Sequence, residues 1–179
     1  LNHLEIDPGL AGAVVDWLDP DTELRFPTGG EDVVYTSQDP PYRTANAMIT
    51  STSELMAIAG FDRDIYRRLA PYITVLPRGT KLNVNTASDV VLASLSDNLD
   101  LATAAALVEE RADAEFLDID ATFEGLVVPD TLQEIDGVSE HFLLTATVTL
   151  GSNQLTMRSV HQRDRSGITR ALFRSLGVE

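Results

Sequence analysis

The hydrophobic pattern changes its period after Gly137, and this change limits the chain to folds that combine helices with an antiparallel sheet. Upstream, apolar residues recur at helical spacing. The first such segment begins at Asp7-Pro8, where an Asp cap precedes a Pro in the first turn, and it ends at Asp19-Pro20. Downstream, apolar and polar residues alternate along 142–150, the pattern of a strand with one buried face. We therefore expect an α+β protein.

The downstream part predicts a three-stranded antiparallel meander. Gly151-Ser152-Asn153 is a tight connection, and residues 155–160 supply the returning strand of a hairpin. Ser166-Gly167 predicts another turn, followed by a third strand over 168–176. Such a meander needs a partner surface to cover its apolar face.

The middle of the chain predicts short helices. Ser51 and Glu54 have capping-box spacing, and a second helix is expected over 62–72. Residues 73–76 look β-like, and Thr86 or Ser88 is expected to cap the next helix. An alanine-rich helix follows over 101–110.

Composition excludes several classes of function. The formal charge of −15 repels phosphate backbones at long range, so we expect no binding to nucleic acid. The chain has no cysteine, which excludes disulfides and thiolate chemistry. It contains no apolar run of about 18 residues, so we do not expect it to span a membrane. It opens on Leu1, so we expect a piece of a longer protein.

An acidic stretch follows the first helix and is the densest group of polar residues. Carboxylates this close repel one another unless water or a hard cation neutralises them, and calcium takes six to eight oxygens. The EF-hand template fails, because Leu24 stands where Gly is needed and Gly30 where the bidentate Glu is needed. A calcium site and a solvated acidic loop both remain open. The carboxylates are Asp16, Asp19, Asp21, Glu23, Glu31 and Asp32.

Motifs for catalysis are missing from the sequence. The three histidines, His3, His141 and His161, do not share a helical or strand spacing, so a multi-histidine zinc site is not expected. Neither a nucleophile elbow nor a phosphate-binding glycine loop is present. We expect no enzyme.

One segment offers an alternative function. Residues 82–88 resemble the opening of a helix-hairpin-helix nucleic-acid-binding domain, in which a Gly-x-Gly hairpin presents backbone amides to a phosphate. The corresponding stretch here, 96–100, has no glycine and two acids. A capped, packed helical pair is the competing interpretation.

Three stretches together resemble the minor pseudopilin K family of type II secretion systems (the general secretion pathway protein K family). Their order and spacing match, and the likeness continues into the C-terminal hairpin. They are Val14-Val15-Asp16-Trp17-Leu18-Asp19-Pro20-Asp21, Pro40-Pro41-Tyr42-Arg43-Thr44-Ala45-Asn46-Ala47 leading to Ser51-x-Ser53-Glu54-Leu55, and Leu82-Asn83-Val84-Asn85-Thr86-Ala87.

The resemblance implies a helical domain, SAM-like or helix-hairpin-helix-like, inserted into a pseudopilin-type antiparallel sheet. On this basis residues 1–18 lead from the scaffold, 19–137 form the inserted domain with its acidic metal-binding loop, and 138–179 form the pseudopilin β-meander. It also implies a periplasmic domain, held at the inner membrane of a Gram-negative bacterium through an N-terminal helix outside this sequence.

The resemblance further implies a non-enzymatic subunit that caps the pseudopilus tip, helps initiate its assembly and protein export, and forms a heterocomplex with minor pseudopilins I and J. It implies structural calcium in the acidic loop, near Asp16, Asp19, Asp21, Glu31 and Asp32.

Overall fold

The computed structural model describes residues 1–164 and 166–177. The chain folds as two compact units, Leu1–Val75 and Leu76–Glu179. The predicted domain boundaries at residues 18 and 137 stay a prediction. Residues 165, 178 and 179, which belong to the predicted meander, lie outside the described residues.

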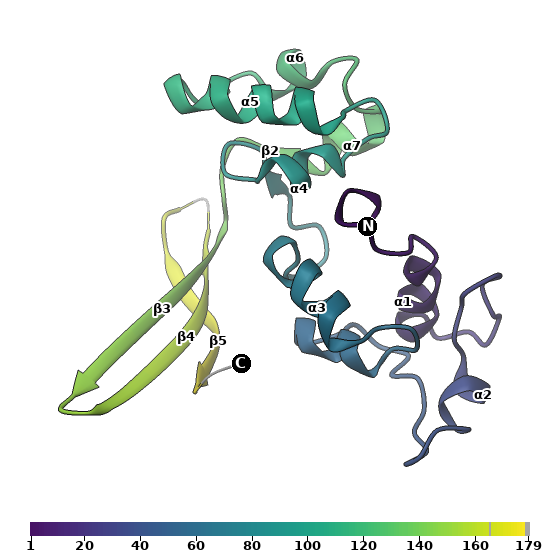
Figure 1. The fold of residues 1–179 in the computed structure, drawn as a ribbon. Coiled ribbons are helices and arrows are strands. Elements are labelled where there is room, and N and C mark those ends of the chain that lie inside the picture. The colour runs from purple at the N-terminus through teal and green to yellow at the C-terminus, as the bar shows by residue number, and fades with distance from the viewer. Residues whose placement is uncertain (165, 178–179) are drawn as a thin grey trace. The chain divides into compact units, whose positions relative to one another are not determined.

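The first unit consists of short helices joined by long irregular segments (Figure 1). Its first α-helix buries one face, but it begins at Leu10 and not at the predicted Asp7-Pro8. The predicted Asp cap is wrong: Gly9 is the N-cap, no side chain caps the helix, and the Asp7 carboxylate accepts from the amide of Gly9 in the turn before it. The capping box of Ser51 and Glu54 is also present, although the helix that it caps is a 3-10 helix. The elements are η1 (Asn2–Leu4), α1 (Leu10–Leu18), α2 (Asp32–Tyr35), η2 (Thr52–Ala57), α3 (Arg63–Leu69) and η3 (Ala70–Tyr72).

A small aromatic core holds this unit together. Trp17 of α1 meets the ring of Tyr35 of α2 edge-on, with the ring centroids 5.1 Å apart. Tyr35 is fully buried, and its hydroxyl accepts a hydrogen bond from the amide of Ala59. Leu55 and Ile58 complete the buried cluster with Ala13. The pairing of rings joins segments far apart in the sequence.

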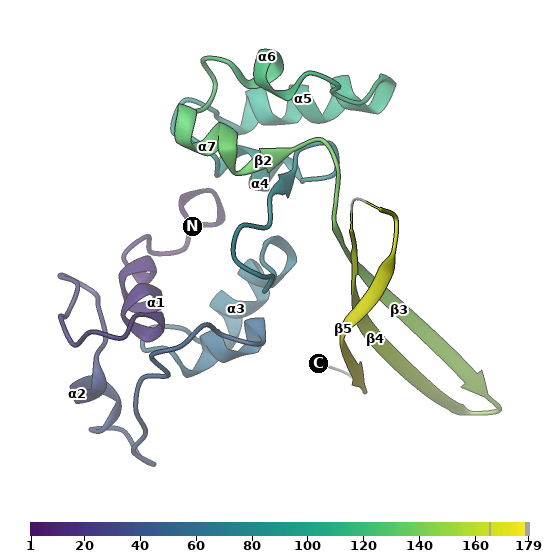
Figure 2. The same cartoon turned by 180° about the vertical axis from the view of Figure 1, so that it is seen from behind.

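The second unit begins with a helical region in which polar side chains cap three of the helices. The Ser88 hydroxyl accepts from the amide of Val91, the Asp100 carboxylate accepts from the amide of Thr103, and the Asp118 carboxylate accepts from the amide of Ala121. Seen from both sides, α4 to α7 gather around a two-stranded parallel ladder (Figures 1 and 2). The elements are β1 (Leu82–Asn83), α4 (Asp89–Ala93), α5 (Leu101–Asp113), α6 (Ile119–Phe123), α7 (Pro129–Gln133) and β2 (Ile135–Asp136).

The core of this helical region is larger than that of the first unit. Phe123 and Leu92 are fully buried, and Phe116 packs edge-on against Phe123 at 6.0 Å between centroids. The guanidinium of Arg111 donates to the carbonyls of Val84 and Ala87 and so satisfies the turn before α4. The buried members are Val84, Ala87, Leu92, Ala93, Leu99, Ala104, Leu107, Phe116, Phe123, Val127 and Ile135.

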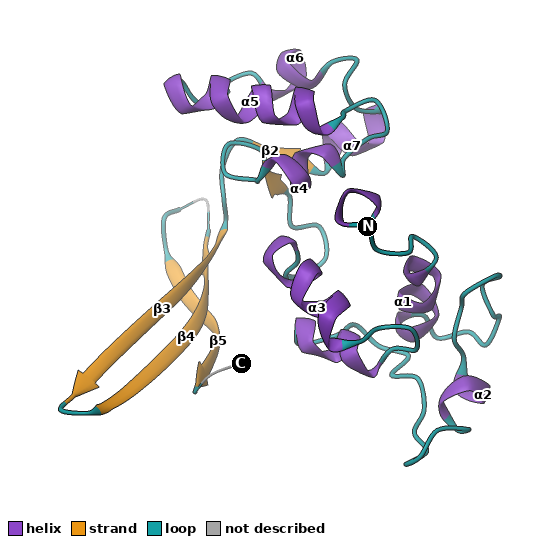
Figure 3. Cartoon of the chain, viewed as in Figure 1, coloured by secondary structure: helices purple, strands orange, loops and turns teal. Residues whose placement is uncertain are grey.

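An antiparallel meander with its own sheet ends the chain, in the order β3-β4-β5 (Figure 3). It consists of β3 (His141–Leu150), β4 (Asn153–Arg163) and β5 (Thr169–Leu176). A bulge between Val160 and His161 shifts the β4–β5 register. The α+β class and the predicted meander are therefore confirmed.

Two further local predictions are wrong. Residues 73–76 form no strand, because no neighbouring segment pairs with them among the described residues. The expected buried face of β3 is exposed, with Leu144 at 48% and Val148 at 54%. Alternation marks which side chains can be buried, but burial needs a second layer, and the described residues supply none over β3.

In the described part of the chain, the helices are too short or too polar to cross a membrane.

Candidate metal centre

The acidic stretch lies between α1 and α2, and local turns fix its first carboxylates. α1 ends at Leu18, and Asp19 is already extended, with φ −83° and ψ 156°, ahead of Pro20. One oxygen of Asp21 accepts a hydrogen bond of 2.8 Å from the amide of Glu23, which closes a small turn and holds the Asp21 side chain. The other Asp21 oxygen takes no part in that turn.

Asp19, Asp21 and Glu31 converge. Each offers one carboxylate oxygen, and these oxygens lie within 4.8 Å of one another. Two oxygens that bind the same calcium ion at about 2.4 Å cannot be more than about 4.8 Å apart, so one ion could contact all of them. We call Asp19, Asp21 and Glu31 the carboxylate triad.

Glu31 is the most unusual member of the triad. Its side chain is only 5% exposed, and neither of its carboxylate oxygens accepts a hydrogen bond. Burial, together with the nearby carboxylates of Asp16, Asp19 and Asp21, raises the pKa of Glu31. A buried carboxylate without a partner destabilises the fold, and a bound cation would remove that cost.

Asp16 lies beside the triad but is held by another partner. It is fully buried on α1, and one oxygen accepts a hydrogen bond of 3.0 Å from the backbone amide of Arg25. The other oxygen lies 3.5 Å from Nε of Arg25. Gly29 makes this fold of the loop possible, since a Cβ there would overlap Asp16 Oδ2 and lie 2.6 Å from the amide nitrogen of Arg25. Asp16 therefore holds the loop against α1 through its contacts with Arg25.

Asp32 faces a different segment. One of its oxygens accepts from both the amide and the hydroxyl of Thr44, at 3.1 and 2.9 Å, and the other lies 3.4 Å from the guanidinium of Arg43. The structure thus brings together three of the five carboxylates that the sequence suggested. The other two contact different residues: Asp16 accepts a hydrogen bond from Arg25, and Asp32 accepts one from Thr44.

Sequence reasoning missed Arg25 and Gly29. Arg25 is the only lysine or arginine among the first 42 residues, and this isolation within an acidic stretch was the available signal. The need for Gly29 had no such signal, because it depends on a side chain 13 positions earlier in the chain.

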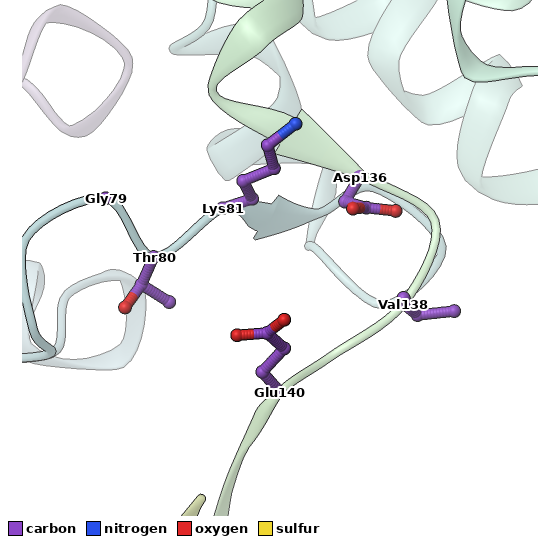
Figure 4. A pocket seen from close by; sticks show the side chains of 6 residues that line it. All are labelled: Gly79, Thr80, Lys81, Asp136, Val138 and Glu140. Atoms are coloured by element: carbon purple, nitrogen blue, oxygen red, sulfur yellow. The ribbon is translucent and has the colours of Figure 1, made fainter. Parts of the chain in front are cut away.

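A hollow opens beside the β1–β2 ladder, with a volume of about 250 Å³ (Figure 4). Lys81 precedes β1, Asp136 ends β2, and Glu140 lies on the segment that leads to β3. Thr80 supplies a hydroxyl to its lining, and that hydroxyl donates to the backbone carbonyl of Pro77 and not to the carboxylate of Asp136 or Glu140.

The histidines and the helical pair are the other places where the sequence could carry chemistry. His141 lies opposite Gln162, and His161 lies opposite Phe142, so the two histidines point to opposite faces of the meander. At the start of α5, the Asp100 carboxylate accepts from Thr103 and occupies the position where a helix-hairpin-helix domain would need to receive a phosphate.

Protein-family models describe the matching family as type II secretion system (T2SS), protein K. One matches residues 1–78 and the other residues 82–140. A type II secretion system protein K from Pseudomonas aeruginosa is 33% identical over 97% of this chain and 52% of its own length. Another from Pectobacterium carotovorum is 34% identical over 84% of this chain and 49% of its own. The chain thus spans about half the length of these relatives.

A solved structure shares the fold. It is the GspK-GspI-GspJ complex from the type 2 secretion system of enterotoxigenic Escherichia coli, and the match covers 96% of this chain and 63% of the matched chain. The TM-score is 0.75 at 21% sequence identity. At that identity the likeness concerns the fold.

Proposed function

This chain belongs to the type II secretion system protein K family, and from that premise we propose that it is part of a non-enzymatic minor pseudopilin that caps the tip of the secretion pseudopilus. In this proposal it also helps to initiate assembly of the fibre and protein export. Its partners are minor pseudopilins I and J, and it is a periplasmic domain anchored in the inner membrane by a segment outside this sequence.

The shared fold with one chain of the GspK-GspI-GspJ complex carries this proposal. A cap needs bulk at the end of a fibre. Here the helical and irregular segments before residue 141 contain many more residues than the meander does. A large body at the growing end blocks the next subunit sterically and needs no reactive side chain. The nucleic-acid alternative gains nothing from the structure, given the Asp100 cap and the net charge of −15.

Co-expression with the I and J pseudopilins of the same organism tests the partner proposal. The full-length protein without its membrane anchor should co-elute with both as one heterocomplex in size-exclusion chromatography. Removing the K protein from cells should give longer fibres, and the full-length protein should restore their length. Separate elution of all three proteins would contradict the proposal.

We also propose that the carboxylate triad holds a structural calcium ion. The observation that carries this is the buried, unpartnered carboxylate of Glu31 beside Asp19 and Asp21. Calcium would supply charge neutralisation. With the ion bound, Asp19 and Asp21 at the end of α1 would be linked to Glu31, which directly precedes α2, so the loop between the two helices would be ordered.

Glu31→Gln gives the sharpest test, because its effect should reverse in sign between two conditions. In excess chelator the variant should be more stable than the wild type, since a buried unpaired charge is gone. In calcium at about a hundred times the dissociation constant, the wild type should gain about 2.7 kcal/mol of stability, and the variant should gain little. Thermal unfolding with calcium and with chelator measures both.

Glu23→Gln is the matched control. It makes the same change of charge in the same loop, but the Glu23 side chain is exposed and outside the triad. Its response to calcium should equal that of the wild type. A wild-type melting temperature that calcium does not change would contradict the calcium proposal.

A further inference from the structure

Arg25 contacts two carboxylates at once, and only one of them belongs to the triad. Its Nε lies 3.5 Å from Asp16 Oδ1, and its terminal nitrogen lies 3.3 Å from Asp19 Oδ2. Asp19 therefore takes part in both groups, as a triad member and as a partner of Arg25.

The burial of these groups differs. Asp16 is fully buried, so it needs a countercharge whether or not an ion is bound nearby. The Arg25 side chain is 55% exposed, so its terminal nitrogen can turn away from Asp19 while Nε stays beside Asp16 and the backbone amide still donates to Asp16. The other oxygen of Asp19 is buried and accepts no hydrogen bond.

Given the proposed calcium site, on which this inference rests, we propose that Arg25 is an internal countercation that competes with the ion for Asp19 and lowers the affinity of the triad for calcium. In the metal-free protein it offsets the repulsion between Asp16 and the three carboxylates of the triad. When an ion binds, the like charge of the guanidinium opposes it, and Asp19 must exchange one cation for another.

This competition gives the positively charged Arg25 side chain a role beside carboxylates that would bind calcium. Without Arg25 the metal-free loop would carry Asp16, Asp19, Asp21 and Glu31 with no basic side chain among them, because no other lysine or arginine occurs before Arg43. Arg25 thus keeps the metal-free loop folded and makes calcium binding weaker and reversible.

Calcium titration by isothermal calorimetry of the Arg25→Gln variant tests the proposal. The dissociation constant should fall about tenfold relative to the wild type, the order of effect expected when one like charge is removed from a part-exposed site. In chelator, the same variant should melt at a lower temperature than the wild type, because Asp16 loses its countercharge.

Arg43→Gln is the matched control, since Arg43 is also paired with an acidic residue of this region but contacts Asp32 outside the triad. Its calcium affinity should stay within about twofold of the wild type, because the charge that it removes is more exposed and more screened. Arg25→Lys keeps the charge without the planar fork and should fall between the wild type and Arg25→Gln. It also provides the readout if Arg25→Gln does not fold in chelator.

The outcomes separate the two proposals. If the wild type binds calcium and Arg25→Gln binds it equally or more weakly while retaining its circular dichroism spectrum, the role of Arg25 is wrong and the calcium site stands. If neither protein binds calcium, both proposals are wrong.

Discussion

Leu1–Val75 and the helical region over 82–140 are stabilised in different ways. The first segment is the longer of the two, yet its buried hydrophobic cluster has five residues against eleven in the second. It compensates with charge pairs, such as Asp16 with Arg25, and with side-chain hydrogen bonds to loops, such as those that Asp32 accepts from Thr44. A small core leaves the fold dependent on polar contacts, and polar contacts respond to ions and pH.

One arginine in each region shows how the two regions differ. Arg111 in the helical region donates to the backbone carbonyls of Val84 and Ala87, which are neutral. Arg25 in the first segment pairs with Asp16 and Asp19, which a divalent ion can also attract. We therefore expect the first segment to respond to calcium and the helical region to be indifferent to it.

The largest effect should come from the core of the helical region. Phe123→Ala removes a fully buried ring that packs on Phe116, and we expect it to lower the free energy of unfolding by about 3–5 kcal/mol. The loss should be the same in calcium and in chelator. Leu117→Ala, at a side chain that is 88% exposed, should change little. Denaturant unfolding in both conditions checks this. A loss at Phe123 that depends on calcium would show that the helical region also responds to the ion.

A smaller effect is expected at Gly29, where no carboxylate is removed. Gly29→Ala places a methyl group against Asp16 Oδ2 and the backbone of Arg25, so the loop must shift, at a cost of about 1–3 kcal/mol. Because the triad depends on that loop, calcium binding should weaken strongly. Calorimetric titration measures it.

Gly12→Ala serves as the control for Gly29. Its nearest contact would be 3.4 Å away, and alanine favours the helix, so stability should hold or rise. Unchanged calcium binding by Gly29→Ala would show that the triad does not need this loop conformation.

The smallest effect should come from pH at the capping box. The amide of Thr50, at 2.6 Å, and further hydrogen bonds from Thr50 and Ser51 lower the pKa of Glu54 below its ordinary value of 4.5. A lowered pKa means that the carboxylate stabilises the fold above the unfolded-state pKa, and that this contribution is lost as the pH falls through the lowered value.

Glu54→Gln should therefore cost about 1 kcal/mol at neutral pH, and the difference from the wild type should shrink below pH 4.5. Urea unfolding across this pH range measures the effect. Glu109→Gln makes the same change of charge at an exposed position on α5 and is the control. A difference at Glu54 that grows toward low pH would contradict this sign.

The sequence alone predicted the features that depend on nearby residues. The capping box of Ser51, the cap at Ser88 and the hairpin at 151–153 follow from local spacing, and the structure has each of them. The two-residue strands β1 and β2 could not be predicted, because a pair of residues has no detectable period and its partner lies some 50 positions away.

The candidate site was only partly visible in the sequence for the same reason. Composition marked the acidic stretch, but it could not say that Asp32 would turn to Thr44 or that Arg25 would hold Asp16. Exposure of the β3 face was likewise hidden, since alternation predicts which residues face together and gives no information about what covers them.

Hydrogen exchange measured by mass spectrometry, on the same protein with calcium and with chelator, tests the central contrast most directly. We expect calcium to slow exchange in peptides that cover residues 10–35 and to leave peptides from residues 82–140 unchanged. Equal slowing in both regions, or no slowing in either, would contradict the account.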